Sequence, residues 1–63
     1  MITITILESK YNISSDYIIK DFLEHININT NYLYSIRNKV CVNVNLTFKE
    51  ANIYNNDILF IPE

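Results

Sequence analysis

One stretch with helical periodicity stands between segments with the two-residue period of strands. In "SSDYIIKDFLEHINI", apolar Ile19, Phe22, Leu23 and Ile26 recur at intervals of three and four residues, which places them in one stripe along a helix. A lone amphipathic helix must bury this stripe against another element. The pattern therefore favours an α+β architecture, in which a single helix packs on one face of a sheet.

The segments on both sides of this helix read as strands. "MITITIL" alternates strictly, and "KYNIS" after it predicts the second strand of a hairpin. "YLYSIR" and "VCVNV" predict two more strands, joined by a turn in which Asn38 can adopt a left-handed conformation. "ILFIP" predicts the last strand. If the two terminal strands pair in parallel, the intervening segment supplies the crossover, so we expect a mixed sheet of four to five strands.

Local signals predict where the helical segments begin and end. Ser14 or Ser15 is the expected cap of the main helix, which should stop near Asn27. Thr47 followed three residues later by Glu50 has the spacing of a capping box, which predicts one helical turn in "TFKEANI". The sequence contains no Gly, so tight turns such as "YNND" must use Asn, Asp or Ser.

Length and charge exclude several classes of function. A chain of 63 residues is one small domain, residues 1–63, without room for a large catalytic cleft. Its net charge is −2, and its five Lys and Arg residues form no basic face of the kind that nucleic acid requires. No apolar run approaches the roughly 20 residues that span a bilayer, and no signal peptide is evident. We expect a cytoplasmic protein that binds neither nucleic acid nor membrane.

Residues that could carry chemistry are few. His25 is the only histidine, and no Ser or Cys is placed with it as a nucleophile. Cys41 stands alone in a Val-rich run, which is typical of a small core residue. No group of residues has metal-ligand spacing. We therefore expect no enzymatic activity, no catalytic residue, no metal and no cofactor.

Aromatic residues are more numerous than the core can hide. Five Tyr and three Phe residues exceed what one helix and five short strands can cover. We expect some Tyr side chains on the open face of the sheet, where Tyr is a common contact residue at interfaces. The alternative, that Tyr merely suits exposed strand positions, stays open. The candidate partner-binding residues are Tyr32, Tyr34, Ile36 and Arg37.

The element order and the last third of the chain carry a family resemblance. "VCVNVNLTFKEANIYNNDILFIP" resembles the closing segment of ubiquitin-like sulfur carriers of the ThiS and MoaD type, in which "L-x-D-G-D" precedes a final apolar strand. The segment 53–57 stands at this motif, and Asn38-Lys39 stands at the family's Asn-Gly turn. "IIKDFLEHINI" resembles the family's helix. The resemblance implies a β-grasp (ubiquitin-like) roll, and it predicts a positive φ at Asn56, where the family has Gly.

The resemblance also implies a function. Carriers of this family serve sulfur transfer in thiamine or molybdopterin biosynthesis, and an activating (adenylating) enzyme modifies their terminal carboxylate. The family's tail ends in Gly-Gly, whereas this sequence ends in Ile61, Pro62 and Glu63, so Glu63 stands at the carrier position. The alternative is a ubiquitin-like interaction module that binds a protein partner without carrier chemistry.

Overall fold

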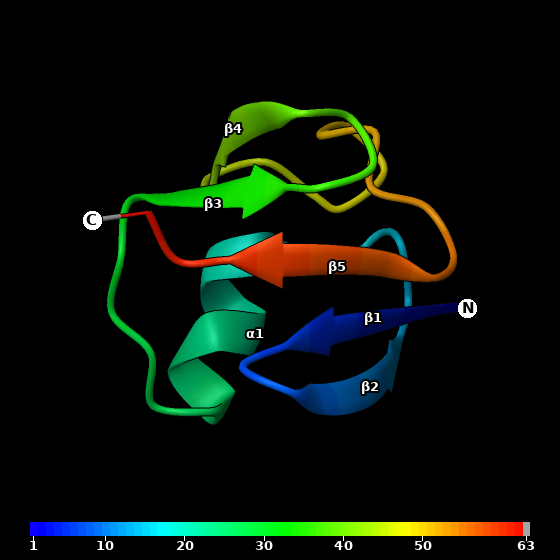
Figure 1. The fold of residues 1–63 in the computed structure, drawn as a ribbon. Coiled ribbons are helices and arrows are strands. Elements are labelled where there is room, and N and C mark those ends of the chain that lie inside the picture. Colours follow the sequence, from blue (N-terminus) through cyan, green and yellow to red (C-terminus); the bar gives the residue numbers. More distant parts are fainter. Residues whose placement is uncertain (63) are drawn as a thin grey trace.

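The computed structural model describes residues 1–62 and shows a five-stranded sheet with a helix packed on one side (Figure 1). Its elements are β1 (Ile2–Ile6), β2 (Ser9–Ile13), α1 (Ile19–His25), β3 (Tyr32–Ser35), β4 (Val40–Asn43) and β5 (Asp57–Phe60). The strand order is β2-β1-β5-β3-β4. The terminal strands β1 and β5 pair in parallel, and the other neighbours are antiparallel. The predicted α+β architecture with a mixed sheet is confirmed.

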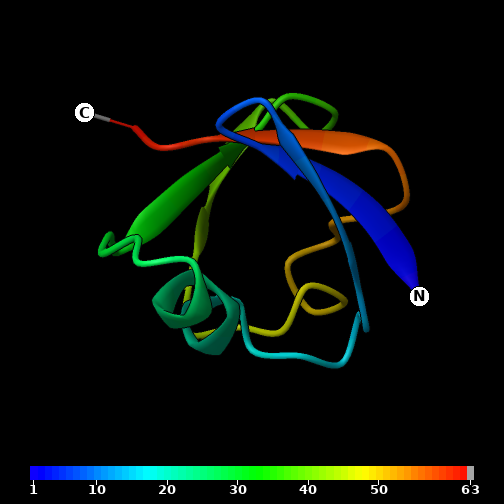
Figure 2. The same cartoon turned by 90° about the horizontal axis from the view of Figure 1, so that it is seen from below.

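The core lies between the sheet and a second layer formed by α1 and the loop-rich segment 44–53, which Figure 2 shows on the same side of the curved sheet. On α1, the predicted stripe faces this core: Ile19, Phe22 and Leu23 are buried, and Ile26 packs against them half-buried. Phe22 and Phe48 meet edge to face, with 5.8 Å between ring centroids. The periodicity of "IIKDFLEHINI" is therefore the pattern that places α1 under the sheet.

The start of α1 differs from the prediction, because neither Ser14 nor Ser15 caps it. The N-cap is Ile18, which makes no side-chain cap bond. The carbonyls of Leu46 and Val44 instead accept the backbone N–H groups of Ile19 and Lys20, at 3.0 and 2.8 Å. Segment 44–46 thus satisfies donors that a helix start leaves free, and no serine is needed there. Ser14 closes a tight turn upstream, where its Oγ accepts the Asp16 N–H.

The end of α1 is confirmed at Asn27, which adopts a left-handed conformation with φ of 61°. The Ile28 N–H donates to Leu23 O at 2.9 Å, and the Asn27 N–H donates to Glu24 O at 3.2 Å. This pair of bonds is a Schellman motif, which usually requires Gly at the left-handed residue. Asn is the most tolerant substitute in a chain without Gly.

The predicted capping box is also confirmed. The Thr47 N–H donates to Glu50 Oε1, and the Glu50 N–H donates to Thr47 Oγ1, both at 3.0 Å. The helical turn that follows ends at Asn52, with φ of 59° and an Ile53 N–H to Phe48 O bond of 2.9 Å. The turn therefore buries both Phe48 and Ile53 in the core.

Three sheet turns use left-handed residues other than Gly. Asn56 has φ of 69°, which confirms the expectation at this position. The β3–β4 turn differs from its prediction: Lys39, and not Asn38, is left-handed, with φ of 58°. A Lys39 N–H to Ser35 O bond of 2.8 Å closes a four-residue loop there, and Lys39 is the last residue of that loop. Leu7 and Glu8 join β1 to β2 with φ of 49° and 67°.

Candidate functional site

The open face of the sheet carries exposed apolar side chains at its centre. Side chains alternate along each strand, so the neighbours of buried Leu33 and Leu59 point away from α1. Tyr34 stands opposite Phe60 in the β3–β5 register. The Ile36 N–H donates to Ile58 O at 3.0 Å, which places Ile36 beside Ile58. We call this set the open-face patch, and its members are Tyr32, Tyr34, Ile36, Ile58 and Phe60.

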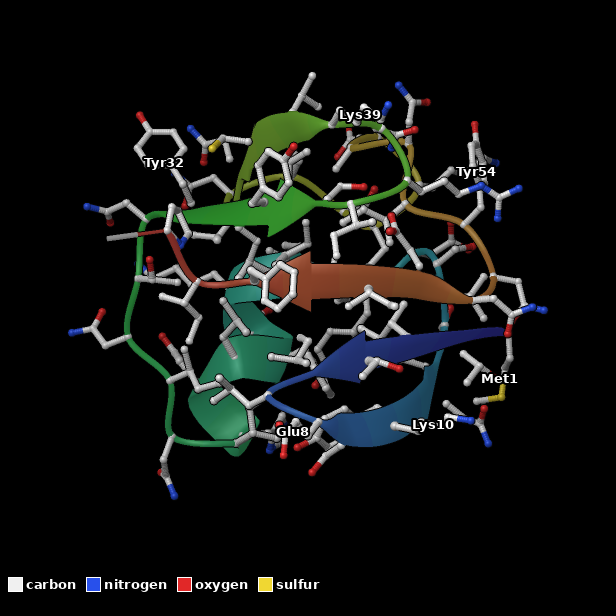
Figure 3. All side chains as sticks on the ribbon, in the orientation of Figure 1. Met1, Glu8, Lys10, Tyr32, Lys39 and Tyr54 are labelled. Carbon is white, nitrogen blue, oxygen red and sulfur yellow. The ribbon has the colours of Figure 1, made fainter. Side chains whose placement is uncertain are left out.

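The patch is large for a chain of this size. Tyr32 and Phe60 are each 51% exposed, and Ile58 is 41% exposed. Four of its five members are large apolar or aromatic residues that are at least 39% exposed, and a contiguous exposed apolar patch on a monomer is often functional. In Figure 3, where the open face is toward the viewer and α1 lies behind, Tyr32 stands at the start of β3. Two aromatic rings without a covering layer give this face the composition of an interface core.

A buried polar network fixes the strands that carry the patch. The Asp57 carboxylate, 1% exposed, accepts the Ser35 hydroxyl at 2.6 Å and the Ile58 and Arg37 N–H groups at 2.8 and 3.2 Å. Ser35 Oγ in turn accepts the Asn38 N–H at 3.2 Å. The network therefore connects the start of β5 to the β3–β4 turn. It keeps the patch residues of β3 in register with those of β5.

The residues that the sequence singles out fall in different places. Tyr32 and Tyr34 lie on the open face, as expected, and Ile36 continues their row just beyond β3. Arg37 is held in the turn, where its guanidinium donates to Asn55 O at 2.9 Å, so it lies at the opposite end of β3 from Tyr32. Glu63 lies outside the described residues.

Sequence reasoning missed Ile58 and Phe60. Both belong to "DILF", where every second residue is buried and the others are exposed. The unbroken apolar run of the last strand was the available signal, because a strand with apolar residues at all positions has an apolar outer face. A single sequence does not say whether another layer covers that face.

The remaining tyrosines take other positions. Tyr11 lies on the core side, half-buried, with its ring 5.1 Å from that of Phe22. Tyr54 is exposed, and its hydroxyl donates to Asn52 Oδ1 at 3.2 Å. Tyr17 packs edge to face against His25, with 6.3 Å between centroids. The prediction that the tyrosines cannot all be buried is therefore confirmed.

The residues whose side chains could take part in chemistry lie in two places. A shallow hollow beside α1 is lined by Tyr17, Asp21, Glu24 and His25, and these lining residues include neither Ser nor Cys. Cys41 is exposed on β4 opposite Tyr34, so the prediction of a core cysteine is wrong. Because β4 is an edge strand of the sheet, no other strand of residues 1–62 pairs with its outer side.

Two further properties of residues 1–62 concern metals and membranes. Within residues 1–62, no group of three or more His, Cys, Asp and Glu side chains could hold a metal ion. The single helix of that part of the chain, at seven residues, is too short to cross a bilayer.

Comparisons with known proteins give no relative. No family model, no curated protein and no solved structure matches this chain. A functional proposal therefore depends on the geometry of residues 1–62.

Proposed function

We propose that the chain is a β-grasp (ubiquitin-like) module that binds a protein partner through its open-face patch. The exposed apolar patch over β3 and β5 is the observation that carries this proposal. The parallel pairing of β1 with β5, with a hairpin on each side and α1 beneath, is consistent with the β-grasp arrangement that the sequence resemblance implies.

The chemistry of the patch favours a protein as its ligand. Tyr32, Tyr34 and Phe60 offer large, rigid rings whose burial on binding costs little conformational entropy. Such aromatic residues are enriched among the anchors of protein interfaces. The partner should therefore present an apolar surface of matching size, and ring burial should supply most of the affinity.

Site-specific photo-crosslinking in the source cell tests this proposal. A photoreactive phenylalanine analogue replaces Phe60 in one variant and exposed Lys49, which lies on the other layer, in a second. We expect a discrete adduct from position 60 and none from position 49. The captured protein, purified, should bind the unmodified chain, and Phe60→Ser should weaken that binding at least tenfold without unfolding the domain.

Two results would argue against the open-face patch as the binding surface. One is equal adduct formation from positions 49 and 60, which would indicate contact without a preferred face. The other is an unchanged dissociation constant for the Phe60→Ser and Tyr32→Ser variants when circular dichroism shows that both are folded.

A second candidate function is sulfur transfer of the ThiS/MoaD type, in thiamine or molybdopterin biosynthesis. The path of β5 favours it: this strand is central in the sheet, its Phe60 stands opposite Tyr34 of β3, and Ile61 and Pro62 follow directly after it. An activating (adenylating) enzyme that holds Phe60 and Tyr32 would therefore also hold the residues that lead to the proposed carrier position, Glu63.

Intact-mass measurement tests the carrier function separately. The chain is incubated with an activating enzyme of this pathway, ATP and a sulfur donor, and with the same mixture lacking ATP. We expect a mass increase corresponding to an adenylate or a thiocarboxylate only when ATP is present. An unchanged mass with an enzyme that activates its own carrier would exclude the sulfur-carrier function and leave the interaction module standing.

A further inference from the structure

The outer edge of β4 is an unpaired sheet edge. β4 stands at one end of the strand order and β2 at the other, so each has backbone groups that no strand of residues 1–62 satisfies. An edge of this kind is a template for a strand from another molecule. The two edges differ in how well they are protected against such pairing.

The hydrogen-bond alternation identifies which groups of β4 point outward. The Val44 N–H donates to Asn31 O, so in this register Val42 and Val40 also bond to β3. The residues between them, Cys41 and Asn43, form the non-bonded pairs with Tyr34 and Tyr32. Their N–H and C=O groups therefore point away from the sheet, although Asn43 O also accepts the Leu46 N–H at 3.3 Å.

Nothing in the sequence of β4 protects this edge. Val40–Asn43 contains no charged residue and no Pro, which are the common devices against edge pairing. Val40 lies on the core side of its strand and is still 50% exposed, because no neighbour covers it. The opposite edge strand, β2, carries Lys10 within the strand, whereas the charge nearest to β4 is Lys39 in its turn (Figure 3).

We propose that β4 pairs antiparallel with β4 of a second copy of this chain, around a two-fold axis at Val42. In this register, Cys41 of each copy stands opposite Asn43 of the other, so their outward N–H and C=O groups bond reciprocally. Val40 is then covered by the second copy. The two sheets become one, and their open-face patches lie on a continuous surface.

Charge favours a second copy at β4 over one at β2. Pairing two β2 edges would bring the Lys10 side chains of two copies together, whereas β4 has no charge to repel itself. In the proposed register, the two Lys39 residues are separated by about 20 Å along the strands, beyond the range of strong repulsion at physiological salt. A contact between four-residue strands is small, so the dimer should be weak and reversible.

Sedimentation equilibrium of the full chain, in reducing buffer over a concentration series, tests the proposal. We expect a monomer–dimer equilibrium. Cys41→Lys puts a charge on the edge at an exposed position and should raise the dissociation constant at least tenfold. Ser9→Lys puts the same charge on the opposite edge, also at an exposed position, and should leave the constant unchanged.

Amide hydrogen exchange read by NMR locates the contact. The Cys41 and Asn43 amides should exchange fast in dilute samples and slowly in concentrated ones, whereas the Val42 amide should be protected in both. A monomer at millimolar concentration would overturn the proposal. So would a dimer in which these two amides stay unprotected, or one that Phe60→Ser abolishes and Cys41→Lys leaves intact, since the second copy would then cover the open face.

Discussion

At the residue scale, the structure depends on side chains that replace glycine and on one buried carboxylate. Leu7 and Glu8 both have positive φ in the two-residue turn between β1 and β2, a turn that normally uses Asn-Gly. Asp57 accepts three hydrogen bonds at the base of the open-face patch, with Ser35 as its side-chain donor. Both features can be changed by substitution, with opposite effects on stability.

Replacing Leu7-Glu8 by Asn-Gly should stabilise the domain. A left-handed conformation costs a non-Gly residue about 1–2 kcal/mol, and Asn-Gly relieves most of this cost in such a turn. We expect a gain of about 1 kcal/mol in the free energy of unfolding, measured by urea denaturation. Ser9→Gly, placed one residue later in β2, is the control and should destabilise. A double variant no more stable than the original would show that this turn carries no strain.

Removing the hydroxyl of Ser35 should destabilise the fold. Ser35→Ala takes away the donor to Asp57 Oδ2 and the acceptor of the Asn38 N–H, both in a buried site. The expected loss is about 1–3 kcal/mol in the free energy of unfolding, because a buried carboxylate is left with an unused acceptor. Thr30→Ala, which removes an exposed hydroxyl bonded to Tyr32 O, should cost much less. Equal losses for the two variants would contradict the role assigned to the network.

At the element scale, short local motifs hold the layer beneath the sheet. The capping box and the left-handed Asn52 fix one turn that buries Phe48 and Ile53. Carbonyls of the segment just before this turn receive the first N–H groups of α1. The two halves of this layer therefore support each other, and loosening the turn should also loosen the start of α1.

Thr47→Ala tests the capping box. It removes the acceptor of the Glu50 N–H, and the expected loss is about 1 kcal/mol in the free energy of unfolding. Thr47→Ser keeps the acceptor and should lose much less. Amide exchange at Ile19 and Lys20, which donate to segment 44–46, should accelerate in the alanine variant only. Unchanged exchange at these two amides would contradict the coupling between the turn and α1.

The elements that the sequence predicts correctly are those set by local pattern. Alternation of apolar residues predicts β1, because the sheet face of each side chain follows directly from the two-residue period. The capping box is predicted because Thr47 and Glu50, three residues apart, accept each other's backbone N–H groups. The start of α1 was not predictable in this way, because carbonyls distant in sequence replace the expected serine cap. The burial of Cys41 and the left-handed residue of the β3–β4 turn were predicted wrongly for a related reason: edge position and loop length depend on strand pairing.

At the scale of the whole molecule, one sheet face is covered and the other is not. The second layer of α1 and segment 44–53 covers the core side of the sheet except at Val40 on its edge, and Tyr32, Ile58 and Phe60 lie on the opposite side. The tyrosines of this patch could be predicted from the surplus of aromatic residues, and its β5 members could not. The proposed binding of a protein partner rests on this uncovered apolar face of a small domain.

Substituting the patch should affect binding far more than folding. Phe60→Ser and Ile58→Thr truncate residues that are 51% and 41% exposed to water, so each should lower the free energy of unfolding by only about 1 kcal/mol. Leu59→Ala lies between them on the buried side of β5 and should cost about 2–5 kcal/mol. Urea denaturation of the three variants compares the two faces. Comparable losses for all three would mean that the open face contributes to the core.

The most direct measurement is an NMR titration of the ¹⁵N-labelled chain with the protein captured from position 60. We predict that the shifted amides cluster at Tyr32, Tyr34, Ile58 and Phe60, and that the amides of α1 keep their positions. Shifts confined to the outer side of α1 and the hollow lined by Asp21 and His25 would contradict the account, because binding would then use the opposite layer of the molecule.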